Sequence, residues 1–171
     1  MTFEDTPVPG VFTIELEKIG DERGFFARVF EDRVFEQHGL VSHFTNVNNS
    51  LSAERGTLRG MHFQVAPAAE VKLVRCVRGS FYDVALDLAT GKWFGTMLSA
   101  DNRRMLYVPE GCAHGFLTLE DDTEALYLTT SYWSPDHERG VRWDDPAFAI
   151  DWPAEPVVLS DKDRAWPLSG S

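Results

Sequence analysis

Glycine and proline recur at short intervals along the chain and separate runs rich in Val, Phe, Tyr, Leu and Thr. Residues of these types favour strands, whereas Gly and Pro at such spacing mark turns. The pattern predicts strands at Val11–Leu16, Gly24–Phe30, Phe44–Asn49, Thr57–Phe63, Lys72–Arg78, Phe81–Leu88, Phe94–Ser99, Met105–Val108, Gly115–Leu119 and Ala125–Ser131. Many short strands in one domain imply an all-β sandwich, jelly roll or barrel, since these forms limit exposed sheet edges.

Two segments depart from this strand pattern. Only Asp32–His38 has a helical pattern, with Asp32 expected as the N-cap and Gly39 as the stop. From Ser134 onward, proline interrupts a stretch dense in Asp and Trp, which is not expected to continue a sheet. Large apolar side chains favour an ordered tail wrapped on the strands over a disordered one. These anchors are Trp143, Ile150, Trp152, Leu159 and Trp166.

The length of 171 residues fits a single domain, residues 1–171. No apolar run approaches the roughly 18 residues that a membrane-spanning helix needs, so no membrane span is expected. The N-terminus, Met1 to Asp5, lacks the basic and apolar segments of a secretory signal, which indicates the cytoplasm. Cys76 and Cys112 lie far apart without a CxxC pair, so neither a disulfide framework nor a zinc finger is expected.

The net charge of −11 argues against nucleic acid as a partner, because phosphate neutralisation needs a basic surface. Basic residues nevertheless gather between Arg55 and Arg78, where Glu70 is the single acid. Such a segment is typical of a site for an anionic small ligand, but solvated strand edges explain it about as well. Its basic residues are Arg55, Arg59, Lys72, Arg75 and Arg78.

The segment Gly56–Gln64 contains a histidine on a predicted strand. Side chains two apart share a face of a strand, so His62 and Gly60 should point away from Arg59. A β-bulge at glycine would bring Arg59 and His62 to one face, and the sequence leaves this open. A lone strand histidine is more often structural than catalytic.

A second cluster, Pro109–Phe116, is a turn followed by a strand that begins with His114. Together the two stretches resemble the paired motifs of the cupin superfamily, whose jelly-roll barrels open at one end. The metal-binding version has a further histidine where this chain has Gln64. Because His62 and His114 alone lack the usual nitrogen count, we expect no metal.

The whole chain is similar to one family, the dTDP-4-dehydrorhamnose 3,5-epimerases, on motifs that follow the same order over nearly its entire length. These motifs are Pro9–Val11, Asp21–Phe26, Asn46–Ser50, Leu58–Gln64, Lys72–Val74, Gly79–Asp87, Val108–Phe116, Tyr127–Thr130, Trp143–Pro146, Ile150–Pro153 and Leu159–Asp163. The resemblance implies an all-β, antiparallel jelly-roll (cupin-like) barrel with a short helix and a wrapped Pro- and Trp-rich C-terminal tail.

The resemblance also implies an isomerase that inverts C3 and C5 of a dTDP-4-keto-6-deoxyhexose in rhamnose-type deoxysugar biosynthesis, with no cofactor. Such a reaction removes a proton beside the C4 carbonyl and returns one on the opposite face. His62 matches the family's base and Asp163 the carboxylate that orients it. Tyr127 matches the acid, and Lys72 the cation that stabilises the enolate.

The implied substrate is a nucleotide sugar, bound in part across a subunit boundary. Arg23 matches an arginine that reaches the neighbouring subunit's site and grips the diphosphate, which implies a homodimer with exchanged N-terminal strands. The substrate-binding residues expected from the resemblance and its pocket are Arg23, Phe26, Arg28, Asn46, Asn48, Arg59, Gln64, His114, Tyr132, Trp133 and Lys162.

Three positions depart from the family's pattern: Arg28 replaces a glutamate, Asn46 a glutamine, and Trp133 a tyrosine-like residue. All three concern recognition, so the nucleotide or the sugar substituents are left open. The alternatives for function are a C3-only or C5-only epimerase, a nucleotide-sugar 3,4-ketoisomerase, and a non-catalytic sugar-binding cupin. The ketoisomerase family generally has a second histidine where Gln64 stands.

Overall fold

The computed structural model describes residues 1–170, so Ser171, the last residue of the predicted domain, lies outside the described residues. The strands are β1 (Thr2–Asp5), β2 (Phe12–Glu15), β3 (Lys18–Asp21), β4 (Gly24–Ala27), β5 (Asn46–Ser52), β6 (Leu58–Gln64), β7 (Lys72–Arg78), β8 (Ser80–Asp87), β9 (Trp93–Ser99), β10 (Met105–Val108), β11 (Cys112–Thr118), β12 (Thr123–Thr129) and β13 (Glu138–Gly140). The helices are α1 (Asp32–Gln37) and α2 (Asp161–Ala165). Neither helix is long and apolar enough to cross a membrane, and the described residues contain no other helix.

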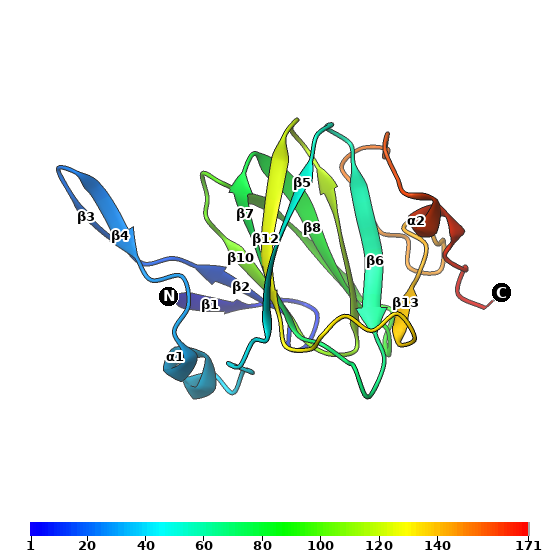
Figure 1. Ribbon diagram of the computed structural model, residues 1–171, viewed down its shortest axis with the longest axis horizontal. Coiled ribbons are helices and arrows are strands. Elements are labelled where there is room, and N and C mark those ends of the chain that lie inside the picture. The colour runs from blue at the N-terminus through cyan, green and yellow to red at the C-terminus, as the bar shows by residue number, and fades with distance from the viewer. Residues whose placement is uncertain (171) are drawn as a thin grey trace.

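Two antiparallel sheets pack face to face and form the body of the molecule (Figure 1). One has six strands in the order β1-β2-β10-β7-β12-β5, and the other has five in the order β13-β6-β11-β8-β9. Strands distant in sequence are neighbours in both sheets, as in a jelly roll. The main core cluster draws side chains from both sheets, including Val74, Phe81 and Leu98, so the apolar core lies between them. The predicted all-β jelly-roll fold is confirmed.

Each predicted strand overlaps an observed one, but β1, β3 and β13 were not predicted. The sequences of β1 and β3, TFED and KIGD, lack a regular alternation of apolar and polar residues. Both strands lie outside the centre of a sheet, where burial does not impose that alternation. The pattern of apolar and polar residues therefore gave no indication of these two strands.

The predicted helical segment Asp32–His38 is present as α1, but its N-cap differs from the expected one. The N-cap is Glu31, not Asp32, and Asp32 instead accepts a hydrogen bond from the backbone N–H of Arg33. The only buried residue of α1, Phe35, packs with residues of β2, β7 and β10 on the outer face of the six-stranded sheet. Apolar packing rather than a side-chain cap thus fixes the helix.

The C-terminal tail is ordered and covers the outer face of the five-stranded sheet, where Ile150 and Trp152 pack on the cluster around Met61. Contrary to expectation, the tail does add a strand, because β13 pairs with β6. The prolines that argued against a strand flank residues 138–140 and do not interrupt them. A second helix, α2, was also not predicted.

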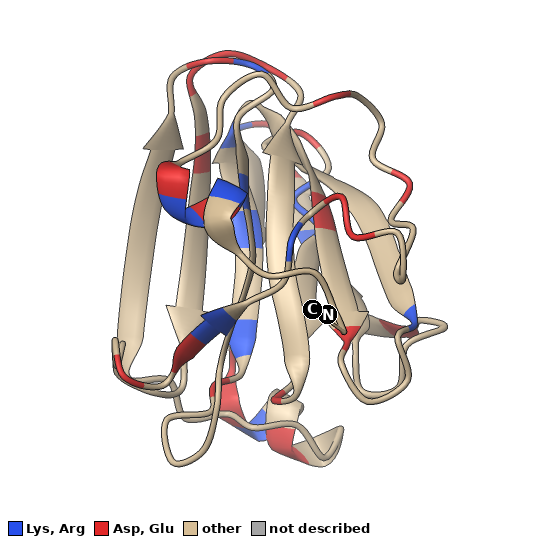
Figure 2. Ribbon diagram, turned by 90° about the vertical axis from the view of Figure 1, so that its right-hand side faces the viewer, with Lys and Arg blue, Asp and Glu red and all other residues tan. Residues whose placement is uncertain are grey.

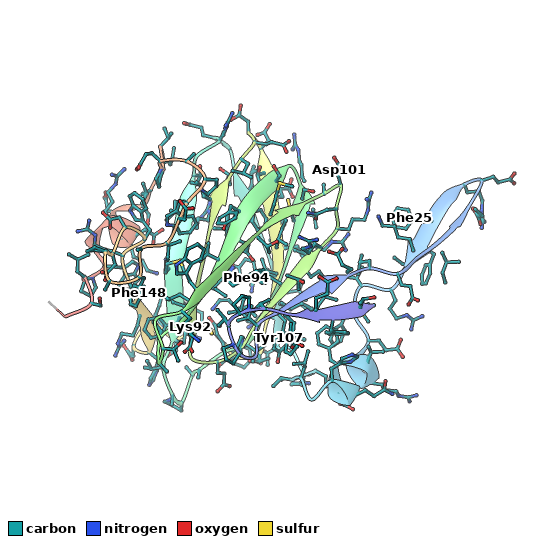
Figure 3. All side chains as sticks on the ribbon, turned by 180° about the vertical axis from the view of Figure 1, so that it is seen from behind. Phe25, Lys92, Phe94, Asp101, Tyr107 and Phe148 are labelled. Atoms are coloured by element: carbon teal, nitrogen blue, oxygen red, sulfur yellow. The ribbon has the colours of Figure 1, made fainter. Side chains whose placement is uncertain are left out.

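The hairpin of β3 and β4 projects from the body and exposes apolar side chains (Figures 1 and 3). Ile19 is 71% exposed and Phe26 60% exposed. Phe25, labelled in Figure 3, has the guanidinium carbon of Arg103 4.8 Å from its ring centroid. A hairpin with this much exposed apolar surface is typical of a segment that contacts another molecule.

A β-bulge in β6 settles which residues share its inner face. His62 pairs with His114 and Arg59 with Phe116, so β6 has one more residue than β11 between these pairs. Because of the extra residue, the side chains of Arg59 and His62 do not point to opposite faces of β6 as a regular strand would require. Both line the same cavity.

The bulge depends on the close approach of two glycines. A Cβ atom on Gly60 would lie 2.5 Å from Cα of Gly115, and one on Gly115 would lie 2.7 Å from Sδ of Met61. Such distances leave no room for a side chain at either position.

We expect Gly115→Ala to lower the free energy of unfolding by about 1–3 kcal/mol, because the added methyl group overpacks the contact between the paired strands β6 and β11. Equilibrium urea unfolding measures this change. Gly20→Ala is the matched control, since its Cβ would meet only the carbonyl oxygen of Gly24 at 3.4 Å. This control should stay within about 0.5 kcal/mol of the parent chain. Equal changes in the free energy of unfolding for the two substitutions would contradict the close contact between Gly60 and Gly115.

Candidate active site

The two sheets enclose a cavity of about 610 Å³. A smaller cavity of about 280 Å³ adjoins it and shares five lining residues, His62, Lys72, Tyr127, Trp133 and Glu138. His62 belongs to the five-stranded sheet, whereas Lys72 and Tyr127 belong to the six-stranded sheet. A molecule in the larger cavity therefore meets ionisable groups on two sides.

His62 and Asp163 form a tight pair although 101 residues separate them. Nε2 of His62 lies 2.5 Å from Oδ1 of Asp163, whose residue is 4% exposed. Burial raises the pKa of Asp163, but the hydrogen bonds from His62 and Ser160 outweigh it and hold this pKa below its ordinary value. An ionised carboxylate can only accept, so Nε2 carries the proton and Nδ1 is left as the basic nitrogen.

Tyr127 presents a protonated phenol to the cavity. Burial raises its pKa above the ordinary value, the charge of Arg59 opposes this rise, and the charge of Glu70 adds to it. The phenol is therefore a proton donor at neutral pH, on the sheet opposite His62.

Lys72 is paired with Glu70, and both side chains are largely buried. The other carboxylate oxygen of Glu70 accepts a hydrogen bond from Nε2 of Gln64 at 3.3 Å. The carboxylate thus holds the ammonium at the boundary of the two cavities. Sequence reasoning noted Glu70 only as the one acid of a basic segment and did not give it a role.

His114 has a buried carboxylate as its partner. Its Nε2 lies 2.7 Å from Oδ1 of Asp83, and Asp83 is completely buried. Burial raises the pKa of Asp83, against the opposing effect of His114. This pair orients the second imidazole at the cavity wall. Asp83 was not predicted, although an acid inside the apolar strand Phe81–Leu88 was a signal that could have found it.

Glu138 connects two predicted substrate-binding residues. Its carboxylate lies 2.5 Å from Nζ of Lys162 and accepts a hydrogen bond from Nε1 of Trp133 at 3.1 Å. Burial raises the pKa of Glu138, but the contacts with Lys162 and Trp133 outweigh it and keep the group ionised. Glu138 lies on β13, the strand that the sequence did not predict.

The structure gathers most of the predicted site residues around the two cavities. Those that line the larger one are Arg59, His62, Lys72, His114, Tyr127, Trp133, Lys162 and Asp163. Asn46, Asn48 and Gln64 line the smaller one. Both ends of the Gln64 amide are engaged by the protein, since its oxygen accepts from the backbone N–H of Ser134 at 2.6 Å and its nitrogen donates to the carbonyl of Ala68 at 3.0 Å.

Four predicted substrate-binding residues line neither cavity: Arg23, Phe26, Arg28 and Tyr132. Arg23 binds Asp21 within the projecting hairpin, and Arg28 binds Glu31 at 3.0 Å. Tyr132 is 72% exposed. A role for these side chains in this chain's own cavity is therefore not supported.

Charge is distributed unevenly over the strands and loops (Figure 2). Asp and Glu are frequent in the loops at the strand ends, whereas several Lys and Arg lie on the strands themselves.

Within residues 1–170, no three His, Cys, Asp or Glu side chains gather as they do around a metal ion. The cavity combines an oriented imidazole, a phenol on the opposite wall and cations in the same lining, a set that can move protons and stabilise an anion.

Sequence comparison identifies the relatives of this chain. The family model described as dTDP-4-dehydrorhamnose 3,5-epimerase matches residues 5–169. A curated relative, the dTDP-4-dehydrorhamnose 3,5-epimerase of Shigella flexneri, is 46% identical over 164 residues, which cover 92% of this chain and 90% of the relative.

Solved structures agree with this match. The dTDP-4-dehydrorhamnose 3,5-epimerase of Bacillus anthracis, with TDP and PPi bound, has a TM-score of 0.92 and 43% identity and covers 98% of both chains. The dTDP-6-deoxy-D-glucose-3,5-epimerase RmlC of Legionella pneumophila, in complex with dTDP-4-keto-L-rhamnose, has a TM-score of 0.90 and 37% identity, covering 98% of this chain and 92% of the other. This chain therefore belongs to the dTDP-4-dehydrorhamnose 3,5-epimerase family.

Proposed function

We propose that this chain inverts C3 and C5 of a dTDP-linked 4-keto-6-deoxyhexose and so supplies a rhamnose-type deoxysugar. The observation that carries the proposal is the 2.5 Å contact between His62 and Asp163 at a cavity whose opposite wall holds Tyr127. The relatives bound to TDP and to dTDP-4-keto-L-rhamnose support a nucleotide sugar as the substrate.

In this proposal, Nδ1 of His62 takes the proton from the carbon beside the C4 ketone. The electrons of the broken C–H bond pass to the C4 oxygen, and Lys72 stabilises the resulting enolate charge. The phenol of Tyr127 then donates a proton to the same carbon from the other face, which inverts the centre. Asp163 stabilises the imidazolium that forms in between. Arg59 and His114 add positive or polar groups to the wall that carries His62.

The substrate's diphosphate is bound, in this proposal, by Arg23 of a second copy of the chain. Support comes from the exposed hairpin, where Ile19 and Phe26 have no cover within the described chain. The outer face of the six-stranded sheet adds exposed Val47 and Leu51 and the buried Nε of Arg75, which has no hydrogen-bond partner among the described residues. A homodimer with exchanged hairpins would cover such surfaces.

Three further parts of the proposal rest on sequence patterns. They are the single catalytic domain of residues 1–171, its location in the cytoplasm, and turnover without metal or cofactor. The departures at Arg28, Asn46 and Trp133 concern recognition of the nucleotide and of the sugar substituents.

The direct test is turnover of dTDP-4-keto-6-deoxyglucose in deuterated water, followed by NMR of the product. We expect deuterium at both C3 and C5. Label at one carbon alone would identify a single epimerase, and a rearranged ketone would identify a 3,4-ketoisomerase. Tight binding of the sugar without exchange would identify a binding protein.

His62→Asn should slow exchange at both carbons by about 10²–10⁴-fold, because it removes the basic nitrogen. The initial rate of deuterium incorporation measures this loss. His43→Asn is the matched control, since His43 is exposed and lines neither cavity, and its rate should equal that of the parent chain. Retained exchange in His62→Asn would assign the base to another group.

Tyr127→Phe should leave proton abstraction detectable but slow the formation of inverted product by about 10²-fold or more, because the donor on the opposite face is gone. Comparing deuterium exchange in recovered substrate with product formation separates the two steps. Tyr82→Phe, which changes a tyrosine outside both cavities, should behave like the parent chain. Inversion at the parental rate in Tyr127→Phe would contradict its role as the acid.

Arg23→Ala and His62→Asn should each be inactive alone but recover about a quarter of parental activity when unfolded together and refolded. Half of the dimers would then be mixed, and one of their two sites would combine an intact Arg23 with an intact His62. Activity of the refolded mixture, with each variant refolded alone as its control, measures this. No recovery would contradict the exchange of hairpins between subunits.

A further inference from the structure

The carboxylate of the proposed base pair lies on a short element near the end of the chain. Asp163 belongs to α2, a helix of five residues that follows an extended tail segment. Ser160 caps this helix by accepting a hydrogen bond from the backbone N–H of Asp163 at 3.0 Å. A single helical turn of this kind is not stable by itself, so tertiary contacts must hold it against β6.

Trp166, which directly follows α2, provides such a contact beside His62. The centroid of its ring lies 6.1 Å from that of His62, with an interplanar angle of 65°. The same indole covers Gly140, where a Cβ atom would lie 2.3 Å from Cε2 and 2.6 Å from Nε1 of Trp166. Gly140 is also the register partner of His62 across β13 and β6. Only a glycine at position 140 leaves room for the indole of Trp166, which lies beside the imidazole of His62.

Lys162 makes a second contact between α2 and the same strand. Its Nζ lies 5.6 Å from the centroid of the Trp166 ring and 2.5 Å from Oε1 of Glu138 on β13. The helix that carries Asp163 is therefore fixed to β13 through Gly140 and through Glu138.

The indole acts by packing and not by hydrogen bonding. Nε1 of Trp166 is buried and has no hydrogen-bond partner among residues 1–170. Trp166 also lines neither cavity, so it can affect the reaction only through the groups it holds.

We propose that Trp166, seated on Gly140, is a positioning residue that holds Asp163 against Nε2 of His62. This inference rests on the proposed function, because it takes the His62–Asp163 pair as the base. A displacement of about 1 Å at a reacting pair can cost about 10²-fold in rate, so a contact outside the cavity can control turnover.

Trp166→Ala should lower kcat by about 10- to 100-fold while KM changes by less than about threefold, because the substrate-binding groups on the strands, such as Arg59 and His114, stay in place. Trp166→Phe should restore most of the loss, since a ring without an N–H group still fills the seat. Arg164→Ala, an exposed change on the same helix, is the matched control and should leave kcat unchanged. Parental kcat in a folded Trp166→Ala chain would overturn the proposal.

Gly140→Ala provides an independent test, because it keeps the indole of Trp166 but fills the space that the indole occupies. It should lower kcat to an extent similar to Trp166→Ala, and it carries the test if Trp166→Ala does not fold, as judged by urea unfolding. Parental kcat in folded Gly140→Ala would also overturn the proposal.

The Asp163→Asn background separates positioning from general damage to the fold. There, Trp166→Ala should cost less than about a further threefold, because the contact it maintains is already lost. Multiplying effects would contradict action through Asp163. If Asp163→Asn alone retains parental activity, the base pair of the proposed function fails, whereas an inactive Asp163→Asn with a fully active Trp166→Ala refutes only the positioning role.

Discussion

The close approach of the paired strands β6 and β11 at Gly60 and Gly115 is the constraint on which the cavity depends. The two backbones approach so closely that neither position has room for a Cβ atom. The approach accompanies a bulge that turns Arg59 and His62 to the same side, against the alternation of a regular strand. Without it, the imidazole and the guanidinium would face opposite sides of the sheet, and one of them would leave the cavity wall.

The two-sheet architecture supplies what an inversion of configuration requires. A proton must leave one face of a carbon and return to the other, so donor and acceptor have to stand on opposite walls. The five-stranded sheet carries His62 and the six-stranded sheet carries Tyr127. Apolar packing elsewhere between the sheets fixes the distance between these two walls. The tail contributes Asp163 from outside the sheets, which explains why a chain segment remote in sequence completes the pair.

The predicted strands were found from their content of Val, Phe, Tyr, Leu and Thr, whereas β1 and β3 were missed because they also lack an alternation of apolar and polar residues. Among the site residues, His62 and Lys72 were found because motif spacing resembles a known family. The carboxylates of Glu70, Asp83 and Glu138 were not, because an acid's partner is fixed by tertiary contacts that spacing does not encode. The side of the strand that Arg59 faces could not be derived either, since the bulge depends on a contact between two strands.

Both lysines of the larger cavity have internal counter-ions, since Lys72 is paired with Glu70 and Lys162 with Glu138. The guanidinium of Arg59 instead donates to Ser52 and to the carbonyl of Leu51. An anion that pairs with either lysine must therefore displace a carboxylate. Such exchange gives little advantage to small free anions, which offer no other contacts to offset the separation of the pairs. Selectivity for an anion attached to a larger framework then follows from the pairing of both lysines in the resting protein.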